Sequence, residues 1–416
     1  MEGWKDGRLE DAHPFFHNAK NFNAKVQGTQ RNAPALMVFH IGSRSSLSRR
    51  SSLSQGIALL CIFAFHSAHP PSPVNGEEIQ MIREAIQKVV DGNDLTENET
   101  VETMNEIMEG EATDAQIASF ITALRMKGET IEEITGAARV MRSKATPVPT
   151  KHPLVVDTCS TGGTRLESFN ISTTSALVVA GAGVPVAKHG NRGVTRASGS
   201  ANVLMALGVN VELEPEQIGH CIDEVGIGFL FAPMLHGAMK YAIGPRREIG
   251  LRTIFNTVAP LTNPAGARAQ VLGVYAPELT DRHANALNSF GSQHAFVVHG
   301  NDGLDEITTT TTTRVSELAN GSVKTYTLDP TELGIPKAQP EVLLGGTPEE
   351  NAEITMRILK GQQGPQRDIV LLNAAAAIVA GGKADSIPDG LETAAESIDS
   401  GKALEKLEGL VAVSNS

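Results

Sequence analysis

The sequence predicts an α/β protein: a small all-helical N-terminal domain, then a larger domain with a mainly parallel central sheet flanked by helices. Three observations predict this. Between residues 77 and 146, four amphipathic segments open near Asn, Thr or Glu, and most close at Gly. From residue 154 onward, short apolar runs alternate with helical patterns, as in parallel sheets. Two of these runs lead into polar, glycine-bearing loops, which places the candidate ligand chemistry in the larger domain.

Composition narrows the function class. The 416 residues suit one large and one smaller domain, and 41% hydrophobic with 20% charged residues is ordinary for a globular protein. A net charge of -12 argues against nucleic-acid binding, because no basic excess is available for phosphates of a polymer. Three cysteines without C-x-x-C spacing indicate neither a disulfide framework nor a zinc site. We expect small-molecule chemistry in a reducing, cytoplasmic compartment, with no nucleic-acid or membrane partner.

The first 76 residues form an extension that differs from the rest in charge, with eight Lys and Arg against four Asp and Glu up to residue 75. Within residues 43–70, a basic Ser-rich stretch precedes a short apolar run, which is typical of a signal peptide but too short to span a bilayer. A targeting segment, a disordered extension and an overlong start assignment remain open, and we favour the last. We expect residues 77–148 to form the helical domain, joined in space by part of residues 172–200, and residues 149–416 to form the α/β domain.

The first strand-loop-helix unit opens the larger domain. Residues 154–156 read as a buried strand, and Gly162 and Gly163 mark the loop. Ser172 and Thr173 come just before an apolar helical run. Glycine loops that lead into a helix N-terminus expose backbone N–H groups, so this unit predicts a phosphate site.

A second unit follows at once. Residues 184–187 read as a strand and residues 188–196 as a polar loop, with Ser198 or Ser200 as the helix cap. The loop carries Lys188 and Arg192, which are suitable partners for anions. Two such loops in tandem favour a ligand with more than one phosphate.

Two further clusters lie beyond these loops. Basic residues gather between 236 and 252, where they form either a solvated helical face or a carboxylate site; they are His236, Lys240, Arg246, Arg247 and Arg252. Asp305 and Glu306 follow an apolar strand, at the end where open α/β sheets place ligands. A lone acidic pair in a loop is also typical of a solvated turn.

Several motifs together identify a family resemblance. They are TGG at 161–163, NIST at 170–173, VAKHGNR at 186–192, SGSA at 198–201 and LMALGV at 204–209. From residue 77 to the C-terminus, the chain closely resembles the anthranilate phosphoribosyltransferases of tryptophan biosynthesis. The resemblance implies transfer of 5-phosphoribosyl from phosphoribosyl pyrophosphate to the amine of anthranilate, with release of pyrophosphate, by a homodimer joined through its helical domain. The amine is unprotonated near neutral pH, so the resemblance implies positioning and electrostatics and no catalytic nucleophile or base.

The resemblance also assigns residues. Those for phosphoribosyl pyrophosphate lie in the two loops and at the helix starts after them; they are Ser160, Gly163, Thr164, Ser168, Asn170, Ser172, Thr173, Lys188, His189, Gly190, Asn191, Arg192, Arg196 and Ser200. Those for anthranilate are Ser160, Asn191, Arg246 and His236, the last on the access path. Two Mg²⁺ ions would be held by oxygen ligands, one by Ser172 with Glu306 and one by Asp305 with Glu306.

The chain departs from the family pattern in the first loop. Where the family has GTGGD, this chain has Ser160 and Thr164 in place of the leading Gly and the Asp. Compared with the family pattern, Asn202 replaces a frequent Asp and Ala259 replaces a Gly. Gly193 and Arg196 lie where the family commonly has serines. Arg165 and Arg196 add positive charge that would compensate for the lost aspartate or change the acceptor. The alternatives are a relative with another aromatic acceptor, a pyrimidine nucleoside phosphorylase of the same fold, and a non-catalytic nucleic-acid-binding paralogue.

Overall fold

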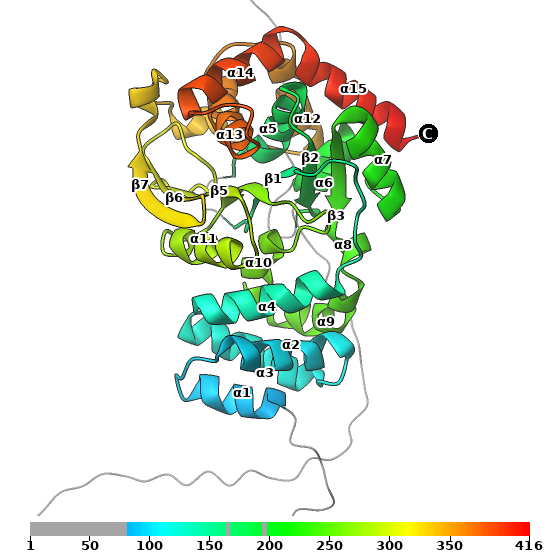
Figure 1. The fold of residues 1–416 in the computed structure, drawn as a ribbon, viewed down its shortest axis with the longest axis vertical. Helices are drawn as coiled ribbons and strands as arrows, with labels where there is room; N and C mark the ends of the chain where they lie inside the picture. Colours follow the sequence, from blue (N-terminus) through cyan, green and yellow to red (C-terminus); the bar gives the residue numbers. More distant parts are fainter. Residues whose placement is uncertain (1–80, 164–166, 194–197) are drawn as a thin grey trace, which may run out of the picture. The chain divides into compact units, whose positions relative to one another are not determined.

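The computed structural model describes residues 81–163, 167–193 and 198–416. Its N-terminal part is a bundle of four helices, in agreement with the sequence (Figure 1). The helices are α1 (Met81–Val90), α2 (Glu97–Glu109), α3 (Asp114–Lys127) and α4 (Ile131–Lys144). Thr96, Thr113 and Thr130 each begin a helix with a reciprocal capping box, which explains why these boundaries are readable from the sequence.

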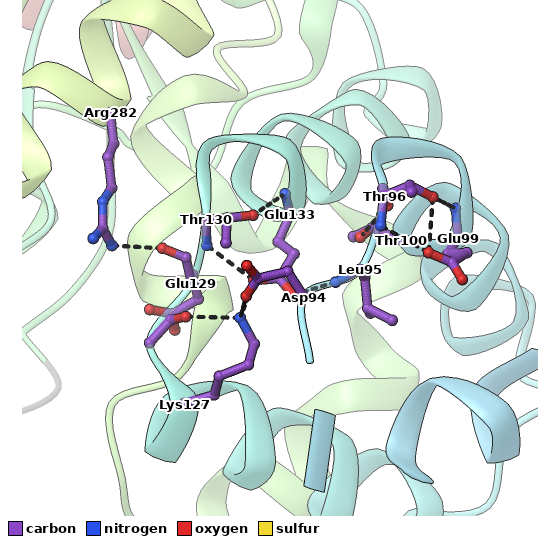
Figure 2. Close-up of polar contacts among 11 residues, drawn as sticks. Asp94, Leu95, Thr96, Glu99, Thr100, Lys127, Glu129, Thr130, Glu133 and Arg282 are labelled. Atoms are coloured by element: carbon purple, nitrogen blue, oxygen red, sulfur yellow. Dashed lines mark hydrogen bonds and ion pairs between the residues drawn. The ribbon is translucent and has the colours of Figure 1, made fainter. Parts of the chain in front are cut away.

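Glu133 is a buried carboxylate that joins three parts of this bundle (Figure 2). It accepts hydrogen bonds from the backbone N–H groups of Leu95 and Thr130 and from the ammonium of Lys127, each at 2.9 Å. A buried charge with its acceptor sites filled in this way fixes the geometry around it. Arg282, from helix α11 (Leu279–Ser289), donates to the Glu129 carbonyl at 2.5 Å, so the α3–α4 turn is bonded to the larger domain (Figure 2).

The larger domain contains a seven-stranded sheet with the order β3-β2-β1-β4-β5-β6-β7. Strands β1 to β5 are parallel, and β6 and β7 are antiparallel to their neighbours. The strands are β1 (Val156–Ser160), β2 (Val186–Gly190), β3 (Ile227–Phe231), β4 (Ala269–Gly273), β5 (His294–Gly300), β6 (Thr313–Ala319) and β7 (Ser322–Leu328). The predicted mainly parallel sheet is confirmed.

Helices cover both faces of the sheet. Besides α11, the helices that follow the bundle in the chain are α5 (Ile171–Gly181), α6 (Ser200–Ala206), α7 (Pro215–Val225), α8 (Ala232–Leu235), α9 (Lys240–Ile249), α10 (Ile254–Val258), α12 (Pro348–Leu359), α13 (Pro365–Ala380), α14 (Ile387–Asp399) and α15 (Lys402–Ser414). Figure 1 shows α5, α13 and α14 on one side of the sheet, and α10 and α11 on the side next to the helical bundle.

One predicted domain assignment is wrong. Part of residues 172–200 was expected to join the helical domain, but nearly every residue of α5 is buried, and the helix lies in the core against α13 and α15. The segments that do join the bundle are α9, α10 and α11, which share a hydrophobic cluster with α1 to α4.

Two features of the C-terminal half differ from the sequence prediction. Residues 313–328 form the hairpin β6–β7, which the prediction did not contain; its turn is Asn320–Gly321, both with positive φ, as a type I′ turn requires. Residues 390–413 form parts of two helices, α14 and α15, a division that the prediction did not contain; Gly401 adopts a left-handed conformation between them. In the described residues, no helix is long and apolar enough to cross a membrane.

Candidate active site

The carboxyl ends of β1, β2 and β4 define the candidate site. The strand order reverses at β1, because β2 follows it on one side and β4 is added later on the other. Open α/β sheets bind ligands outside the carboxyl ends of the strands at such a switch point. The Thr161 N–H donates to the Gly273 carbonyl at 2.9 Å, so the first glycine loop leaves the sheet at this point.

Both strands run further than the sequence suggested. Strand β1 includes residues 157–160, and β2 includes Lys188, His189 and Gly190, which were predicted to lie in the loop. Ser160 and Gly190 are therefore the last residues of their strands, at the edge of the sheet. The predicted strand starts at residues 154 and 184 are both two residues too early.

The first glycine loop depends on two residues with left-handed backbone. Gly162 has φ 67° and Gly163 has φ 82°, a region that other residues rarely occupy. Of the predicted phosphate ligands in this loop, Thr164 lies outside the described residues, as does Arg165. Ser168, the next one along, is half-buried and bridges to Leu344.

The N-terminus of α5 lies next to the end of β1. Thr158 of β1 donates its hydroxyl to the Ser172 carbonyl at 2.9 Å, which fixes the first turn of the helix. Asn170 occupies the N-cap position, so Ser172 and Thr173 lie in the first turn of α5, whereas the sequence analysis placed them just before the helix. The Thr173 hydroxyl is buried and has no hydrogen-bond partner among the residues that the structure describes. An unpartnered buried hydroxyl beside free helix N–H groups is suited to a phosphate oxygen.

Lys188 lies in a buried polar network at the end of β2. Its ammonium donates to the Thr158 carbonyl at 2.5 Å. Burial lowers the pKa of Lys188, and the negative charges of Asp157 and Glu306 oppose this shift. Burial raises the pKa of Asp157 to about 6, although Lys188 and the Asn263 amide, 2.8 Å from the carboxylate, act in the other direction. The network joins β1, β2 and the acidic loop after β5.

His189 and His236 form a second buried pair. Their Nε2 atoms are 3.2 Å apart, and their rings are tilted by 47°. Burial lowers the pKa of His189 to about 3 and that of His236 to about 4. Both rings are therefore neutral near pH 7, with one Nε2 donating and the other accepting.

The second loop is organised by Asn202. Its side-chain oxygen accepts from the Gly193 and Gly199 N–H groups at 2.9 and 3.1 Å, which closes the loop onto the start of α6. This role needs only an acceptor oxygen, so Asn replaces the family's Asp without loss of the bond. The predicted caps Ser198 and Ser200 are wrong, because Gly199 is the N-cap; Ser198 instead donates to Asn170 at 3.2 Å.

Other predicted ligands in this loop are placed as follows. Asn191 is exposed, and its side-chain oxygen accepts from the next N–H at 2.7 Å. Arg192 pairs with Glu212 at 2.7 Å and lies over the Phe231 ring. Arg196 lies outside the described residues.

Asp305 and Glu306 lie beside the switch point, as expected from their place after β5. Both are buried, and a Cβ on Gly273 would overlap the Asp305 carbonyl, so the acidic loop packs directly on β4. Asn373 holds the loop from the other side by accepting from the Ile307 N–H at 2.9 Å. Carboxylates are ligands that Mg²⁺ prefers. In the described residues, no group of three or more His, Cys, Asp or Glu is placed to hold a metal, so other oxygens would complete the coordination.

The basic cluster of residues 236–252 does not form one constellation. Lys240 lies over the Tyr241 ring, and Arg252 donates to the Gly162 carbonyl at 2.7 Å in the first loop. Arg246 is half-buried, 5.1 Å from the Phe255 ring. Burial lowers the pKa of Arg246, and no carboxylate pairs with it in the part of the chain that the structure describes. An unneutralised, partly buried guanidinium is suited to the carboxylate of a ligand.

Sequence reasoning missed two residues of the site and gave a third, Arg252, a different place. Asn263 holds Asp157, Asn351 donates to Asn170 at 3.0 Å, and Arg252 holds the first loop. Asn263 and Asn351 act across 106 and 181 residues, so no local pattern marks them. Cys159 of β1 is buried, and burial raises the pKa of its thiol well above the usual range.

Comparison with known proteins decides the family. The helical bundle domain of the glycosyl transferase family matches residues 83–145, and the a/b domain of that family matches residues 152–404. Anthranilate phosphoribosyltransferases from Acetivibrio thermocellus and Pelotomaculum thermopropionicum are 56% and 58% identical to this chain over 336 and 331 residues. These matches cover 81% and 80% of the chain and 97% and 96% of the relatives. The chain belongs to the anthranilate phosphoribosyltransferase family.

Solved structures of this family agree with the assignment. The anthranilate phosphoribosyltransferase of Thermus thermophilus matches with a TM-score of 0.76 and 43% identity, over 80% of this chain and 99% of that one. The Saccharomyces cerevisiae enzyme in complex with PRPP and Mg matches with a TM-score of 0.74 and 27% identity, over 80% of this chain and 98% of that one. The predicted family membership and fold are therefore confirmed.

Proposed function

We propose that this protein transfers the 5-phosphoribosyl group of phosphoribosyl pyrophosphate to the amine of anthranilate and releases pyrophosphate, the second step of tryptophan synthesis from chorismate. Its family membership supports this, together with the yeast relative solved in complex with PRPP and Mg. The observation that carries the proposal is the buried Thr173 hydroxyl at the start of α5, next to the switch point, for which the described part of the chain supplies no hydrogen-bond partner. A phosphate oxygen would supply the missing partner.

The two loops hold the phosphates and the ribose. The first turn of α5 presents Ser172 and Thr173, and Lys188 brings a positive charge to the same edge of the sheet. Backbone N–H groups and a fixed cation stabilise the negative charge that accumulates on departing pyrophosphate. The residues around the pair His189–His236 exclude water from this end of β2, because both rings are buried.

The donor set fits magnesium. Ser172, Asp305 and Glu306 offer hydroxyl and carboxylate oxygens, the hard ligands that Mg²⁺ takes, and pyrophosphate oxygens would complete the shell. Mg²⁺ would neutralise charge on the pyrophosphate leaving group. We propose two ions, one on Ser172 and Glu306 and one on Asp305 and Glu306. Glu306 also faces Lys188, whose charge limits the repulsion between the neighbouring carboxylates.

Arg246 binds the acceptor in this proposal. The anthranilate carboxylate would pair with its guanidinium, while Asn191, Ser160 and His236 line the rest of the acceptor site. The aromatic amine needs no strong general base, because its lone pair is already free of a proton near neutral pH. The acceptor and the sugar are therefore brought together by binding alone, and orientation supplies most of the rate.

One assay tests the activity and its rivals. Purified protein with Mg²⁺ and phosphoribosyl pyrophosphate should consume anthranilate, whose fluorescence disappears on transfer. Pyrimidine nucleosides with inorganic phosphate should not react, and other aromatic amines should react more slowly. Consumption of another amine in preference to anthranilate would reassign the acceptor, and binding of nucleic acid without any turnover would favour a non-catalytic paralogue.

We also propose a homodimer joined through the helical domain. Large apolar side chains are exposed on α1, α3 and α9, namely Val90, Met126 and Ile243. The mass in solution, measured by light scattering, should be that of two chains, and Met126→Glu should lower it if the interface lies there.

The N-terminal extension is a separate proposal. Both family matches lie downstream of residue 82, so protein lacking residues 1–76 should keep full turnover. The signal-like residues 43–70 lie outside the described residues, and the cytoplasmic assignment rests on the intracellular substrates.

A further inference from the structure

The side chain of Arg252 contacts the first glycine loop directly. Its Nη1 donates to the Gly162 carbonyl at 2.7 Å. A Cβ built on Gly163 would overlap Nη2 of the same guanidinium, so the loop can pass Arg252 only because residue 163 has no side chain. Gly162 and Gly163 also have positive φ, a backbone conformation that residues with side chains rarely adopt. The Arg252 guanidinium therefore lies against a segment of unusual backbone conformation.

Tyr275 fixes the guanidinium from the other side. The Arg252 Cζ atom is 3.9 Å from the centre of the Tyr275 ring, a close stacking distance. The Tyr275 N–H donates to the Thr161 hydroxyl at 3.0 Å, so Tyr275 also contacts the loop directly. Its hydroxyl accepts from Arg125 of α3 at 3.2 Å. The contacts from Arg125 to Tyr275 and from Tyr275 to Arg252 thus connect the helical bundle to the phosphate loop.

We propose that Arg252 is a positioning residue that holds the first glycine loop in its phosphate-binding shape and couples it, through Tyr275, to the helical bundle. This inference rests on the proposed function, because the loop's ligand is taken to be phosphoribosyl pyrophosphate. Arg252 acts here through the loop backbone and not on the reacting atoms. A planar guanidinium can stack on Tyr275 and donate to Gly162 at once, whereas a lysine ammonium cannot do both.

The test compares Arg252→Lys with a matched arginine. Arg142 has the same two kinds of contact elsewhere: its guanidinium is 4.8 Å from the Phe290 ring, and Nη1 donates to the Leu261 carbonyl at 3.0 Å. Arg252→Lys should raise KM for phosphoribosyl pyrophosphate about tenfold or more, as expected for loss of a charge-assisted bond. It should change KM for anthranilate by less than about twofold. Arg142→Lys should lower Tm without a change in either KM.

A double-mutant cycle tests the contact itself. In the wild-type background, the alanine of Gly163→Ala is strained by the positive φ and also overlaps the Arg252 guanidinium. In the Arg252→Ala background, only the strain from the positive φ remains. We expect Gly163→Ala to weaken phosphoribosyl pyrophosphate binding less in Arg252→Ala than in the wild type. Additive effects of the two substitutions would overturn the proposed contact.

The outcomes separate this inference from the proposed activity. If the wild type binds and turns over phosphoribosyl pyrophosphate but Arg252→Lys has unchanged affinity by calorimetry, the positioning role is wrong. If Arg252→Lys changes both KM values equally and matches Arg142→Lys in its loss of Tm, Arg252 has only a structural role. If the wild type itself neither binds nor turns over the substrate, the proposed function fails first.

Discussion

The Nε2 atoms of His189 and His236 lie 3.2 Å apart in a buried position between β2 and the segment after α8. Two imidazoles can share a hydrogen bond at this distance only when at least one is neutral, because two cations would have no acceptor and would repel. Burial is the main reason that the pKa of His189 is lowered, and the charges of His236 and of Lys188, the residue before it, act in the same direction. The two imidazoles are therefore both neutral and share a hydrogen bond, although histidine usually titrates near physiological pH.

This pair predicts a loss of stability in acid. The folded pKa values of His189 and His236, about 3 and about 4, lie below the usual 6.5, so the unfolded chain binds these protons first. Stability should be full above pH 6.5 and should fall as the pH drops toward 4, by about 1.4 kcal/mol per pH unit for each proton. Urea unfolding between pH 7.5 and 4.5 measures this slope.

Asp157 requires a control in that experiment. Burial raises its pKa to about 6, so its protonation favours the folded state as the pH falls from 6 toward 3.8, opposite to the histidines. His236→Gln retains Asp157 and removes one titrating ring, so its slope should be shallower than that of the wild type. Parallel curves for the two proteins would contradict the neutral pair.

Thr173 and Thr174 are neighbours with opposite expected effects. Thr173→Val removes an unpartnered buried hydroxyl, so the free energy of unfolding should rise by about 1 kcal/mol while phosphoribosyl pyrophosphate binds about tenfold more weakly. Thr174 bonds the Thr355 hydroxyl at 2.9 Å, so Thr174→Val should lower stability by about 1–3 kcal/mol and leave KM unchanged. Chemical denaturation and steady-state kinetics check both; equal effects on binding would exclude the phosphate role of Thr173.

Glu306→Gln should remove most of the turnover. The amide keeps the shape but loses the charge that Mg²⁺ needs, so we expect a fall of at least about 100-fold and a higher Mg²⁺ concentration for half-maximal rate. Glu317→Gln is the control, because Glu317 pairs with His294 at 2.9 Å in β6 and should affect stability alone. An unchanged Mg²⁺ response in Glu306→Gln would remove the metal assignment.

Asn202 predicts a tolerant and an intolerant substitution. Asn202→Asp keeps the acceptor for Gly193 and Gly199 and should retain at least about half the activity, whereas Asn202→Leu leaves two N–H groups unpaired at a cost of about 1–3 kcal/mol each. In Asn202→Leu, KM for phosphoribosyl pyrophosphate should rise because the second loop is no longer closed. Similar kinetics for the two variants would show that this cap has no part in binding.

Glu133 predicts a large effect on the bundle. Glu133→Ala leaves Lys127 and two backbone N–H groups without their buried acceptor, which should cost about 3–5 kcal/mol of unfolding free energy. Glu396→Ala removes an exposed pair with Lys402 and should cost less than about 1 kcal/mol. Thermal and urea unfolding of the two variants should differ clearly, and equal midpoints would contradict the network shown in Figure 2.

Local signals explain what the sequence predicted well. Three of the four bundle helices, α2, α3 and α4, begin at capping boxes, which are complete within four residues, and the switch-point loops carry their glycines next to apolar runs. The predicted ends of strands β1 and β2 were wrong for a physical reason. Asp157 and Lys188 look like loop residues, but each is buried against partners that lie far along the chain, Asn263 for Asp157 and Thr158 for Lys188. A single sequence does not show those partners.

The hairpin β6–β7 was missed in spite of a local signal. The threonines at 308–313, just before the hairpin, obscured the alternation of apolar and polar residues that indicates a strand. The dipeptide Asn320–Gly321 is nevertheless a typical hairpin turn. The placement of Arg252 could not be predicted at all. It follows α9 in the chain, and only the packed structure shows that it contacts the loop ninety residues earlier instead of a ligand carboxylate.

The central position of β1 has a consequence for biosynthesis. On the ribosome, β1 emerges early and pairs with β2, but its other edge waits for β4, more than a hundred residues later. At about 5–20 residues per second, this edge stays open for several seconds in a nascent chain. An unpaired strand edge is a template for aggregation, so we expect chaperones to be needed during this interval and truncated chains that end before β4 to be insoluble.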